Sequence, residues 1–304
     1  MKVLREVAAQ GSFSAAATAL SFTQSAVSQQ VAALEREVGT TLLERGPRGV
    51  RLTDAGRTLV SHTDAILCRI QDAEEDLAAL AGLRGGRLRL ASFQSAGATL
   101  VPRAVAGFHG RHPKVDLSMV EAEPIDARER LRAGDIDLAL VYDFERLPGG
   151  LGEDLEITHL IDDTYDAVVG VDHKLAGRRR LRLTDLADDP WICATDQCGC
   201  RVITERACQD AGFEPRVAFE ADETMAAQAL VAAGVGVTIF PRLALNPLHP
   251  GVVTRSLGAD APVRRIWAAR LREGYRSPAS EAMLQILVDV AEDFRANPPL
   301  VAVS

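Results

Sequence analysis

The 304-residue sequence lacks several features that would place it in other classes of protein. No apolar run reaches the ~20 residues that a membrane-spanning helix needs. The N-terminus has no apolar stretch typical of a secretory signal peptide. Aromatic residues make up only 5%, yet hydrophobic residues reach 47%, which suffices for ordinary folded cores. We therefore expect a cytoplasmic protein of about two or three domains.

The sequence also lacks the usual marks of an α/β enzyme. It has no phosphate-binding loop, no dinucleotide glycine fingerprint and no nucleophile elbow. His109 and His112 are close in sequence, but no acidic residue accompanies them, and His112-Pro113 is typical of a loop after a helix. We expect no enzyme activity, no catalytic residue, no metal site and no resident cofactor.

Cysteine is scarce, and the number of cysteines is odd. The five are Cys68, Cys193, Cys198, Cys200 and Cys208. An odd number in a long intracellular chain argues against a disulfide framework and favours reduced thiols.

Charge is spread unevenly along the chain. The formal net charge is −8. Residues 1–60 hold seven Lys or Arg and five Asp or Glu, so this part is +2 and the remainder is −10. A mildly basic region on an acidic protein can still bind DNA, because phosphates respond to the local charge.

The first forty residues have the pattern of a helix-turn-helix. Residues 2–10 predict a short helix that ends at Gly11, and Ser12 is placed to cap a second helix. Thr23 is placed to cap a third helix, in which one stripe is apolar: Val27, Val31, Leu34 and Val38. The opposite side is small and neutral apart from one arginine, with Ser25, Ser28, Gln29, Ala32 and Arg36. Two short helices of this kind predict a DNA-binding motif.

A basic hairpin is predicted next, in "LLERGPRGVRLTDAG". Gly46-Pro47-Arg48-Gly49 has the chemistry of a turn between two short strands. Arg45, Arg48 and Arg51 project from it, which suits a wing that grips phosphates or the minor groove. A solvated arginine loop is the alternative.

A long helix is predicted from Thr53 or Asp54 to about Gly82. Its apolar positions alternate four and three residues apart, at Leu59, Thr63, Ile66, Ile70, Ala73, Leu77 and Leu80. A narrow heptad stripe on a long helix favours dimerisation. Packing against the same chain is the alternative.

Beyond "RGGRL" at 84–88 the pattern changes to alternating strands and helices. Strand-like runs LRLASF, VDLSMVEA and IDLALVYD alternate with helical runs at 98–111 and 124–133, which predicts a βαβαβ unit. A second alternation follows "DDTYDAVVGVDH", with helices near 200–212 and 223–233. Strands near 252–257 and 263–271 and a helix at 279–295 complete the chain. Two such units predict two lobes with a cleft between them, near the carboxyl ends of the strands.

At this point the sequence resembles a LysR-type transcriptional regulator over roughly its whole length. The resemblance rests on "GSFSAAATAL", "TQSAVSQQVAALEREVG", "LLERGPRGVRLTDAG", "HPKVDL", "LRAGDIDLAL" and "LVAAGVGVTIFP", in family order. It implies a fold of α/β class with an all-α-type head. The head is a winged helix-turn-helix at 1–53, followed by a linker and dimerisation helix at 54–83. An effector-binding domain like a type 2 periplasmic binding protein follows at 84–304, with lobe I at about 87–161 and 265–304 and lobe II at about 162–264.

The sequence departs from the family pattern in two places. The family usually has several residues before "VLREVAAQGSF", so either the start is late or the first helix is short. Ser25 stands where proline is common, at the first turn of the recognition helix, and this changes little of the fold because that N–H is not needed there.

The resemblance places the DNA-contacting residues on the third helix and the wing. Amide and hydroxyl groups read base edges, and arginines contact the backbone. We expect contacts from Ser12, Thr23, Gln24, Ser25, Ser28, Gln29, Arg36, Arg45, Arg48 and Arg51. The resemblance also implies partners: double-stranded promoter DNA, a second copy in a homodimer or homotetramer, and RNA polymerase.

We expect the effector to contact segments of both lobes that face the cleft. The loop "SFQSAGA" leads into a helix N-terminus that would favour an anion. Pro124 stands where threonine is sometimes found and removes a hydrogen bond, which puts specificity for an acid in doubt. The acidic side chains of Asp222 and Glu223 disfavour an anion in the cleft. The expected contacts are Ser95, Ala96, Gly97, Pro124, Tyr142, Cys198, Gly199 and Thr224.

Three cysteines give an alternative function within the same family. The peroxide-sensing branch uses two cysteines in this region, one near the position of Cys208, while Cys198 and Cys200 flank the other position. A low-pKa thiol would be oxidisable, and Cys-x-Cys could bind a soft metal. Burial as small apolar residues is the structural alternative. A more distant alternative is a solute-binding protein without DNA function.

Overall fold

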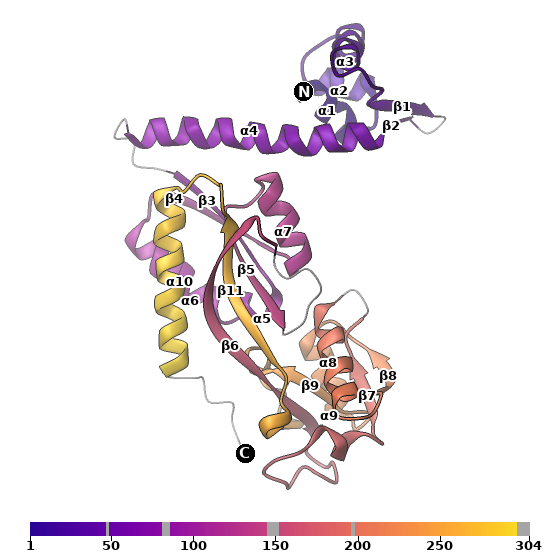
Figure 1. Ribbon diagram of the computed structural model, residues 1–304, viewed down its shortest axis with the longest axis vertical. Coiled ribbons are helices and arrows are strands. Elements are labelled where there is room, and N and C mark those ends of the chain that lie inside the picture. The colour runs from indigo at the N-terminus through magenta and orange to yellow at the C-terminus, as the bar shows by residue number, and fades with distance from the viewer. Residues whose placement is uncertain (47–48, 81–85, 145–151, 196–197, 297–304) are drawn as a thin grey trace. The chain divides into compact units, whose positions relative to one another are not determined.

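The computed structural model describes residues 1–46, 49–80, 86–144, 152–195 and 198–296. Its internal contacts define two compact units (Figure 1). The N-terminal unit comprises Met1–Gly85 with the short segment Arg132–Asp135, and the C-terminal unit comprises Gly86–Leu131 and Ile136–Ser304.

The N-terminal unit begins with three short helices, α1 (Lys2–Gln10), α2 (Phe13–Ala19) and α3 (Gln24–Val38). Ser12 and Thr23 cap α2 and α3: their hydroxyl oxygens accept hydrogen bonds from the backbone N–H groups of Ala15 and Ala26, at 3.5 and 3.2 Å. Gly11 ends α1 with φ +61°, a left-handed conformation that favours glycine. The predicted helix-turn-helix is therefore present, with its predicted caps.

These helices enclose a small apolar core. It includes Leu4 and Val7 of α1, Ala16 of α2, and Val27 and Val31 of α3, all buried. The prediction of a buried stripe along α3 is wrong at its last member. Val38 is 46% exposed, because it lies in the final turn of the helix beyond the core.

A two-stranded antiparallel hairpin follows, formed by β1 (Leu43–Gly46) and β2 (Gly49–Leu52). Glu35 joins it to α3, since its Oε1 accepts hydrogen bonds from the backbone N–H groups of Leu42 and Leu43 at 2.8 and 3.2 Å. The two strands confirm the predicted wing, whose tip at Pro47-Arg48 lies outside the described residues.

Helix α4 (Asp54–Leu80) confirms the long predicted helix. Near its start Thr63 is buried, but Ile66, Ile70 and Leu77 are 46%, 51% and 67% exposed. The described positions in the far part of the apolar stripe are therefore exposed. The side chains of Cys68 and Leu80 are outside the described part of the structure.

Lobe I of the C-terminal unit is built on a mixed sheet. Its parallel part has β3 (Gly86–Ser92) between β4 (Val115–Glu121) and β5 (Leu138–Phe144), as the βαβαβ pattern predicts. β11 (Val263–Leu271) returns to pair antiparallel with β5 and with β6 (Leu155–Gly170).

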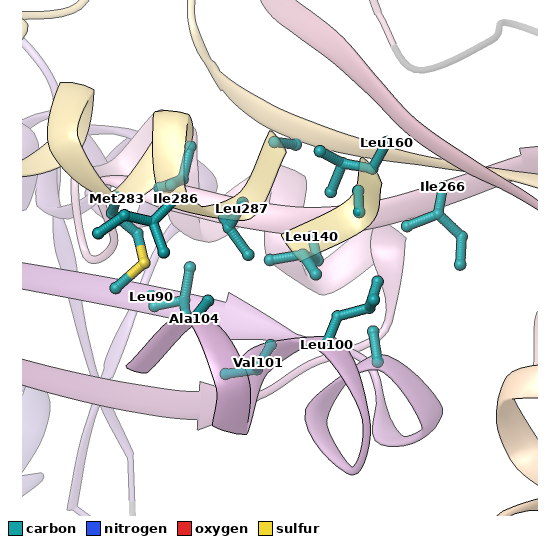
Figure 2. Close-up of a cluster of buried hydrophobic side chains, with 14 of the residues drawn as sticks. Leu90, Leu100, Val101, Ala104, Leu140, Leu160, Ile266, Met283, Ile286 and Leu287 are labelled. Atoms are coloured by element: carbon teal, nitrogen blue, oxygen red, sulfur yellow. The ribbon is translucent and has the colours of Figure 1, made fainter. Parts of the chain in front are cut away.

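Helices cover both faces of the lobe I sheet. On one face α6 (Leu100–Arg111) and α10 (Pro278–Ala296) pack together over the sheet. Figure 2 shows their side chains, among them Ala104 and Met283, meeting Leu90 and Leu140 of the strands. The opposite face carries α7 (Pro124–Ala133), whose Ala127 and Leu131 are buried against the sheet. The short helix α5 (Gln94–Gly97) follows β3 directly.

Lobe II has its own strands and cores. β7 (Pro190–Cys193) and β8 (Arg216–Glu220) are parallel. β9 (Thr238–Pro241) and β10 (Val252–Ser256) pair antiparallel with the second half of β6. Helices α8 (Gly199–Asp210) and α9 (Thr224–Ala232) contribute to different cores.

Strand β6 belongs to both lobes. It pairs with β11 in its first half and with β9 and β10 in its second half. Sequence analysis does not predict this continuous strand, nor β7, because an apolar and polar mixture over 155–170 has no single period. Three short 3₁₀ turns, Leu183–Leu186, Arg242–Leu245 and Gly258–Asp260, complete the described elements. Within the described residues, no helix is both long and apolar enough to span a membrane.

Candidate nucleic-acid interface and ligand cleft

The outer side of α3 is exposed and almost neutral. Gln24, Ser25 and Gln29 are exposed and Ser28 is half-buried. Arg36 is exposed near the end of the helix, where its Nε donates to the carbonyl of Ala32 at 3.3 Å. Small neutral groups on an exposed helix allow close approach to base edges in the major groove.

The other predicted DNA-contacting residues have different positions. Ser12 and Thr23 cap α2 and α3, so their hydroxyl oxygens are already acceptors within the protein. Arg51 lies exposed on β2, next to the hairpin turn. Arg45 lies on β1 with its side chain outside the described residues, and Arg48 is outside them altogether.

A cavity of about 730 Å³ lies between the lobes of the C-terminal unit. The segments that follow β3 and β4 line it from lobe I, with Phe93, Gln94, Glu123 and Pro124, and those that follow β7 and β8 line it from lobe II. This is the edge at which parallel sheets bind ligands. A shallower hollow of about 850 Å³ between α8 and the Gly258–Asp260 turn receives none of these segments.

One hydrogen bond joins the two sides of the cavity. The Thr224 hydroxyl, at the start of α9, donates to Oε1 of Gln94 in α5 at 3.3 Å. Both residues line the cavity. A ligand that binds Thr224 or Gln94 would therefore act on a hydrogen bond between the lobes.

A buried ion pair forms the floor of the cavity. Arg264 of β11 is only 2% exposed, and its Nη2 lies 2.9 Å from Oδ2 of Asp163 on β6, itself 4% exposed. Nη2 also donates to the Ser95 hydroxyl oxygen at 2.5 Å. Burial disfavours the charge of Arg264, but Asp163 outweighs this effect and raises the pKa of the guanidinium.

Aromatic rings enclose this guanidinium. Its central carbon lies 4.9 Å from the ring centroid of Phe93 and 5.1 Å from that of Tyr142. The two rings meet edge to face at 4.8 Å. Arg264 is thus neutralised by Asp163 and covered by Phe93 and Tyr142, so it is part of the folded core as well as of the cavity wall.

The hydroxyl of Tyr142 links lobe I to α8. It donates to Oε2 of Glu123 at 2.6 Å, and burial raises the pKa of the phenol. Gly199, at the first position of α8, lies against the same hydroxyl, since a Cβ there would be 3.0 Å from it. A side chain at position 199 would therefore require Tyr142 to shift.

The cysteines of the cavity differ from those of the core. A hydrogen bond from Cys198 and the nearby Arg264 guanidinium lower the pKa of the Cys200 thiol to about 6, although burial opposes this. The Tyr165 hydroxyl also donates to its sulfur at 3.8 Å. Cys208 is fully buried, and burial raises the pKa of its thiol to about 12. In the described residues no three His, Cys, Asp or Glu side chains are grouped to hold a metal ion.

The structure brings six of the eight expected effector contacts to the cavity. They are Ser95, Pro124, Tyr142, Cys198, Gly199 and Thr224. Ala96 and Gly97 are not among the lining residues. Ala96 is fully buried in the core of lobe I, because the short helix α5 turns that side inward. The loop at Ser95 also differs from the expected anion site, since α5 has only four residues and the Ser95 oxygen is occupied by Arg264.

Four residues at the cavity were not predicted from the sequence: Arg264, Asp163, Glu123 and Gln94. Two adjacent arginines in the otherwise apolar strand "VRRIWAARL" were a sign that one of them is buried with a partner. Asp163, Glu123 and Gln94 carried no such sign, because their roles depend on contacts with residues 19 to 130 positions away.

Comparisons with known proteins cover both parts of the chain. Residues 1–57 match the family model "Bacterial regulatory helix-turn-helix protein, lysR family", and residues 81–292 match "LysR substrate binding domain". The probable HTH-type transcriptional regulator LrrA of Synechococcus elongatus is 33% identical over 299 residues, which cover 98% of each chain.

Two solved structures are similar in fold. Full-length CbnR, crystallised with its target DNA, has a TM-score of 0.69 at 25% identity, over 95% of this chain and 98% of that one. The effector-binding domain of QuiR in complex with shikimate has a TM-score of 0.61 at 25% identity, over 69% of this chain and 98% of that one. The two family models match the helix-turn-helix head and the two-lobed domain, and LrrA matches along nearly the whole chain. The chain therefore belongs to the LysR family of DNA-binding transcriptional regulators.

Proposed function

We propose that the protein controls promoters through α3 and the β1–β2 hairpin, while a small molecule in the cavity between the lobes changes how it binds DNA. The observation that carries this proposal is the cavity itself. It receives side chains from both lobes, and the Thr224–Gln94 hydrogen bond spans it. A ligand that favours one arrangement of the lobes shifts the population of that arrangement.

DNA recognition would divide between two kinds of contact. Gln24, Ser25, Ser28 and Gln29 would face base edges, and Arg36 and Arg51 would contact phosphates. The hairpin arginines Arg45 and Arg48 would add backbone contacts. The protein would act by binding and without catalysis or a resident cofactor, in the cytoplasm, with RNA polymerase as a further partner.

We also propose that the protein forms a homodimer through α4, and a homotetramer by pairing of dimers. The exposed apolar stripe at Ile66, Ile70 and Leu77 supports the first step. Ile70→Glu should shift the sedimentation of the full chain towards the monomer, whereas Ser61→Glu, on another side of α4, should not. Equal sedimentation of Ile70→Glu and the unaltered chain would contradict this mode of dimerisation.

The first test of the whole proposal is a footprint on the DNA upstream of the protein's own gene, at two salt concentrations. A protected imperfect palindrome that weakens steeply with salt is expected, because arginine contacts to phosphates release counterions. Removal of residues 1–53 should abolish protection and leave ligand binding intact. An absence of protection at low salt, on this DNA and on neighbouring promoters, would contradict the proposed function.

A second candidate, control by thiol chemistry, is favoured by one observation. The pKa of Cys200 is lowered to about 6, which favours the thiolate, the form that reacts with oxidants and binds soft metals. Cys208, by contrast, is fully buried. Alkylation of the thiols should leave DNA binding intact if the small molecule is the only regulator. Loss of DNA binding under mild peroxide, restored by a reductant, would support the second candidate instead.

A further inference from the structure

The cavity between the lobes is rich in carboxylates. Its described lining includes five acidic residues, Glu121, Glu123, Asp126, Asp222 and Glu223, but only two basic ones, Arg128 and Arg264. The position of the ligand site follows from the cavity and from the family match. The surplus of carboxylates bears on a separate question, the charge of the ligand.

The more deeply buried arginine does not offset this surplus. Arg264 makes two hydrogen bonds to Oδ2 of Asp163, from Nε at 3.1 Å and from Nη2 at 2.9 Å, and a third to Ser95. It is 2% exposed beneath Phe93 and Tyr142. A ligand carboxylate would have to compete with Asp163 for a guanidinium that is already paired and desolvated.

On lobe II, the donors of Thr195 and of the start of α9 are already bound to the protein's own carboxylates. The backbone N–H and the hydroxyl of Thr195 both donate to Asp222, at 2.7 and 2.9 Å. Glu223 caps α9 and accepts from the N–H of Ala226 at 2.6 Å. The carboxylates of Asp222 and Glu223 therefore occupy the positions at which an anionic ligand would bind the Thr195 N–H or the positive end of α9.

At the start of α7, lobe I offers acceptors. Pro124, the first residue of α7, has no N–H. In the described part of the chain, Glu123 makes one side-chain hydrogen bond, through Oε2 to Tyr142, which leaves Oε1 as an acceptor. The exposed carboxylates of Glu121 and Asp126 lie on the same rim, beside the apolar Ile125 and Phe240.

From these contacts we infer that the effector is an organic cation, a protonated amine on an apolar body, whose N–H groups bind the Glu123 carboxylate. This inference rests on the proposed function, because it takes the cavity as the effector site. An amine at the Glu123 carboxylate replaces no hydrogen bond among the described residues, whereas a carboxylate at Arg264, at Thr195 or at the start of α9 would displace Asp163, Asp222 or Glu223 from its donors.

Matched pairs of small ligands test the inference on the full chain. The probes are 2-phenylethylamine against 3-phenylpropanoate and pentylamine against hexanoate, with affinity measured by isothermal titration calorimetry. We expect each amine to bind at least about tenfold more tightly than its carboxylate partner, since a hydrogen bond between charged groups is stronger than one between neutral groups.

A substitution locates the effect. Glu123→Gln keeps an acceptor for Tyr142 but removes the charge, so it should weaken amine binding about tenfold and leave the carboxylates unchanged. Glu129→Gln is the matched control, because Glu129 lies on α7 but does not line the cavity. Its affinities should equal those of the unaltered chain.

The outcomes separate this inference from the proposed function. A carboxylate that binds as tightly as its amine, an amine that does not bind at millimolar concentration, or an unchanged amine affinity in Glu123→Gln would overturn the cationic effector. The proposed function would still stand if a carboxylate altered the DNA footprint. If amines bind as expected and no ligand alters the footprint, the cavity's preference for cations stands, but effector control fails and the cationic effector fails with it.

Discussion

The outer side of α3 and the cavity between the lobes are both recognition surfaces, yet they are built in opposite ways. The α3 surface comes from one helix, is exposed, and carries neutral amides and hydroxyls. The cavity comes from segments of both lobes, and its floor is a desolvated ion pair. The α3 surface needs only a helix with the right face, whereas the cavity needs the folded domain.

This contrast predicts where a substitution affects stability and where it affects binding alone. An exposed neutral side chain can be removed from α3 without leaving a buried group unpaired. In the cavity, Arg264 contacts Asp163, Ser95, Phe93 and Tyr142, so the loss of one partner disturbs the others. Four experiments test this contrast between the two surfaces.

The largest expected effect is at the floor of the cavity. Asp163→Asn leaves the Arg264 guanidinium buried without its counter-charge, which should lower the free energy of unfolding by about 3–5 kcal/mol. Urea denaturation of the full chain measures this, with Asp162→Asn as a control, since Asp162 pairs with His159 at the surface. A loss as small as that of the control would show that the pair contributes little.

The next effect should appear on α3 and should concern DNA affinity alone. Gln29→Ala removes a side chain that can pair with an adenine edge, so specific binding should weaken by about 1–3 kcal/mol with unchanged unfolding. Gln30→Ala is the matched control, because Gln30 is also exposed but points about 100° away from Gln29 around the helix. The measurement is a binding titration on the footprinted site, and equal losses in the two variants would rule out base recognition by Gln29.

A smaller effect is expected at the hairpin, and it should depend on salt. Arg51→Gln removes one phosphate contact, which should weaken binding to all sequences alike and lower the slope of log affinity against log salt by about 1. Binding titrations over a range of salt concentrations measure the slope. An unchanged slope with altered sequence preference would place Arg51 at a base.

The smallest effect concerns the thiol at the cavity. Cys198→Ala removes the hydrogen bond that lowers the pKa of Cys200, so this pKa should rise from about 6 towards its ordinary value. The thiolate forms as the pH rises through the pKa, and the iodoacetamide reaction of Cys200 at neutral pH should therefore slow several-fold. Peptide mass spectrometry across pH follows the rate, with the buried Cys208 as an internal reference. An unchanged pH midpoint would show that Arg264 and Tyr165 set the pKa without Cys198.

Much of the fold followed from local patterns. Ser12, Thr23 and Gly11 marked the ends of the head helices, and the alternation of strands and helices gave most elements of both lobes. The wrong predictions concern features that depend on contacts between distant parts of the chain. Val38 continued the stripe of α3 but is exposed, and β6 was not expected as one strand because its two halves pair with different partners.

The candidate sites divide in the same way. The α3 surface could be predicted because the period of a helix fixes which residues share a face. The loops of the cavity could be predicted from the ends of parallel strands, which brought Ser95, Pro124, Tyr142 and Thr224 to its wall. The partner of each side chain could not, since Asp163 and Arg264 are 101 residues apart.

The sequence by itself determined the helix-turn-helix, the hairpin, the long helix and the two-lobed α/β domain, because capping residues, turns and apolar periods act over a few residues. Only the tertiary structure decided the chemistry of the cavity. It set Arg264 against Asp163, bound the N–H groups of Thr195 and Ala226 to Asp222 and Glu223, and left one oxygen of Glu123 without a hydrogen bond among the described residues. Charge compensation depends on distances across the fold, and no local pattern encodes them.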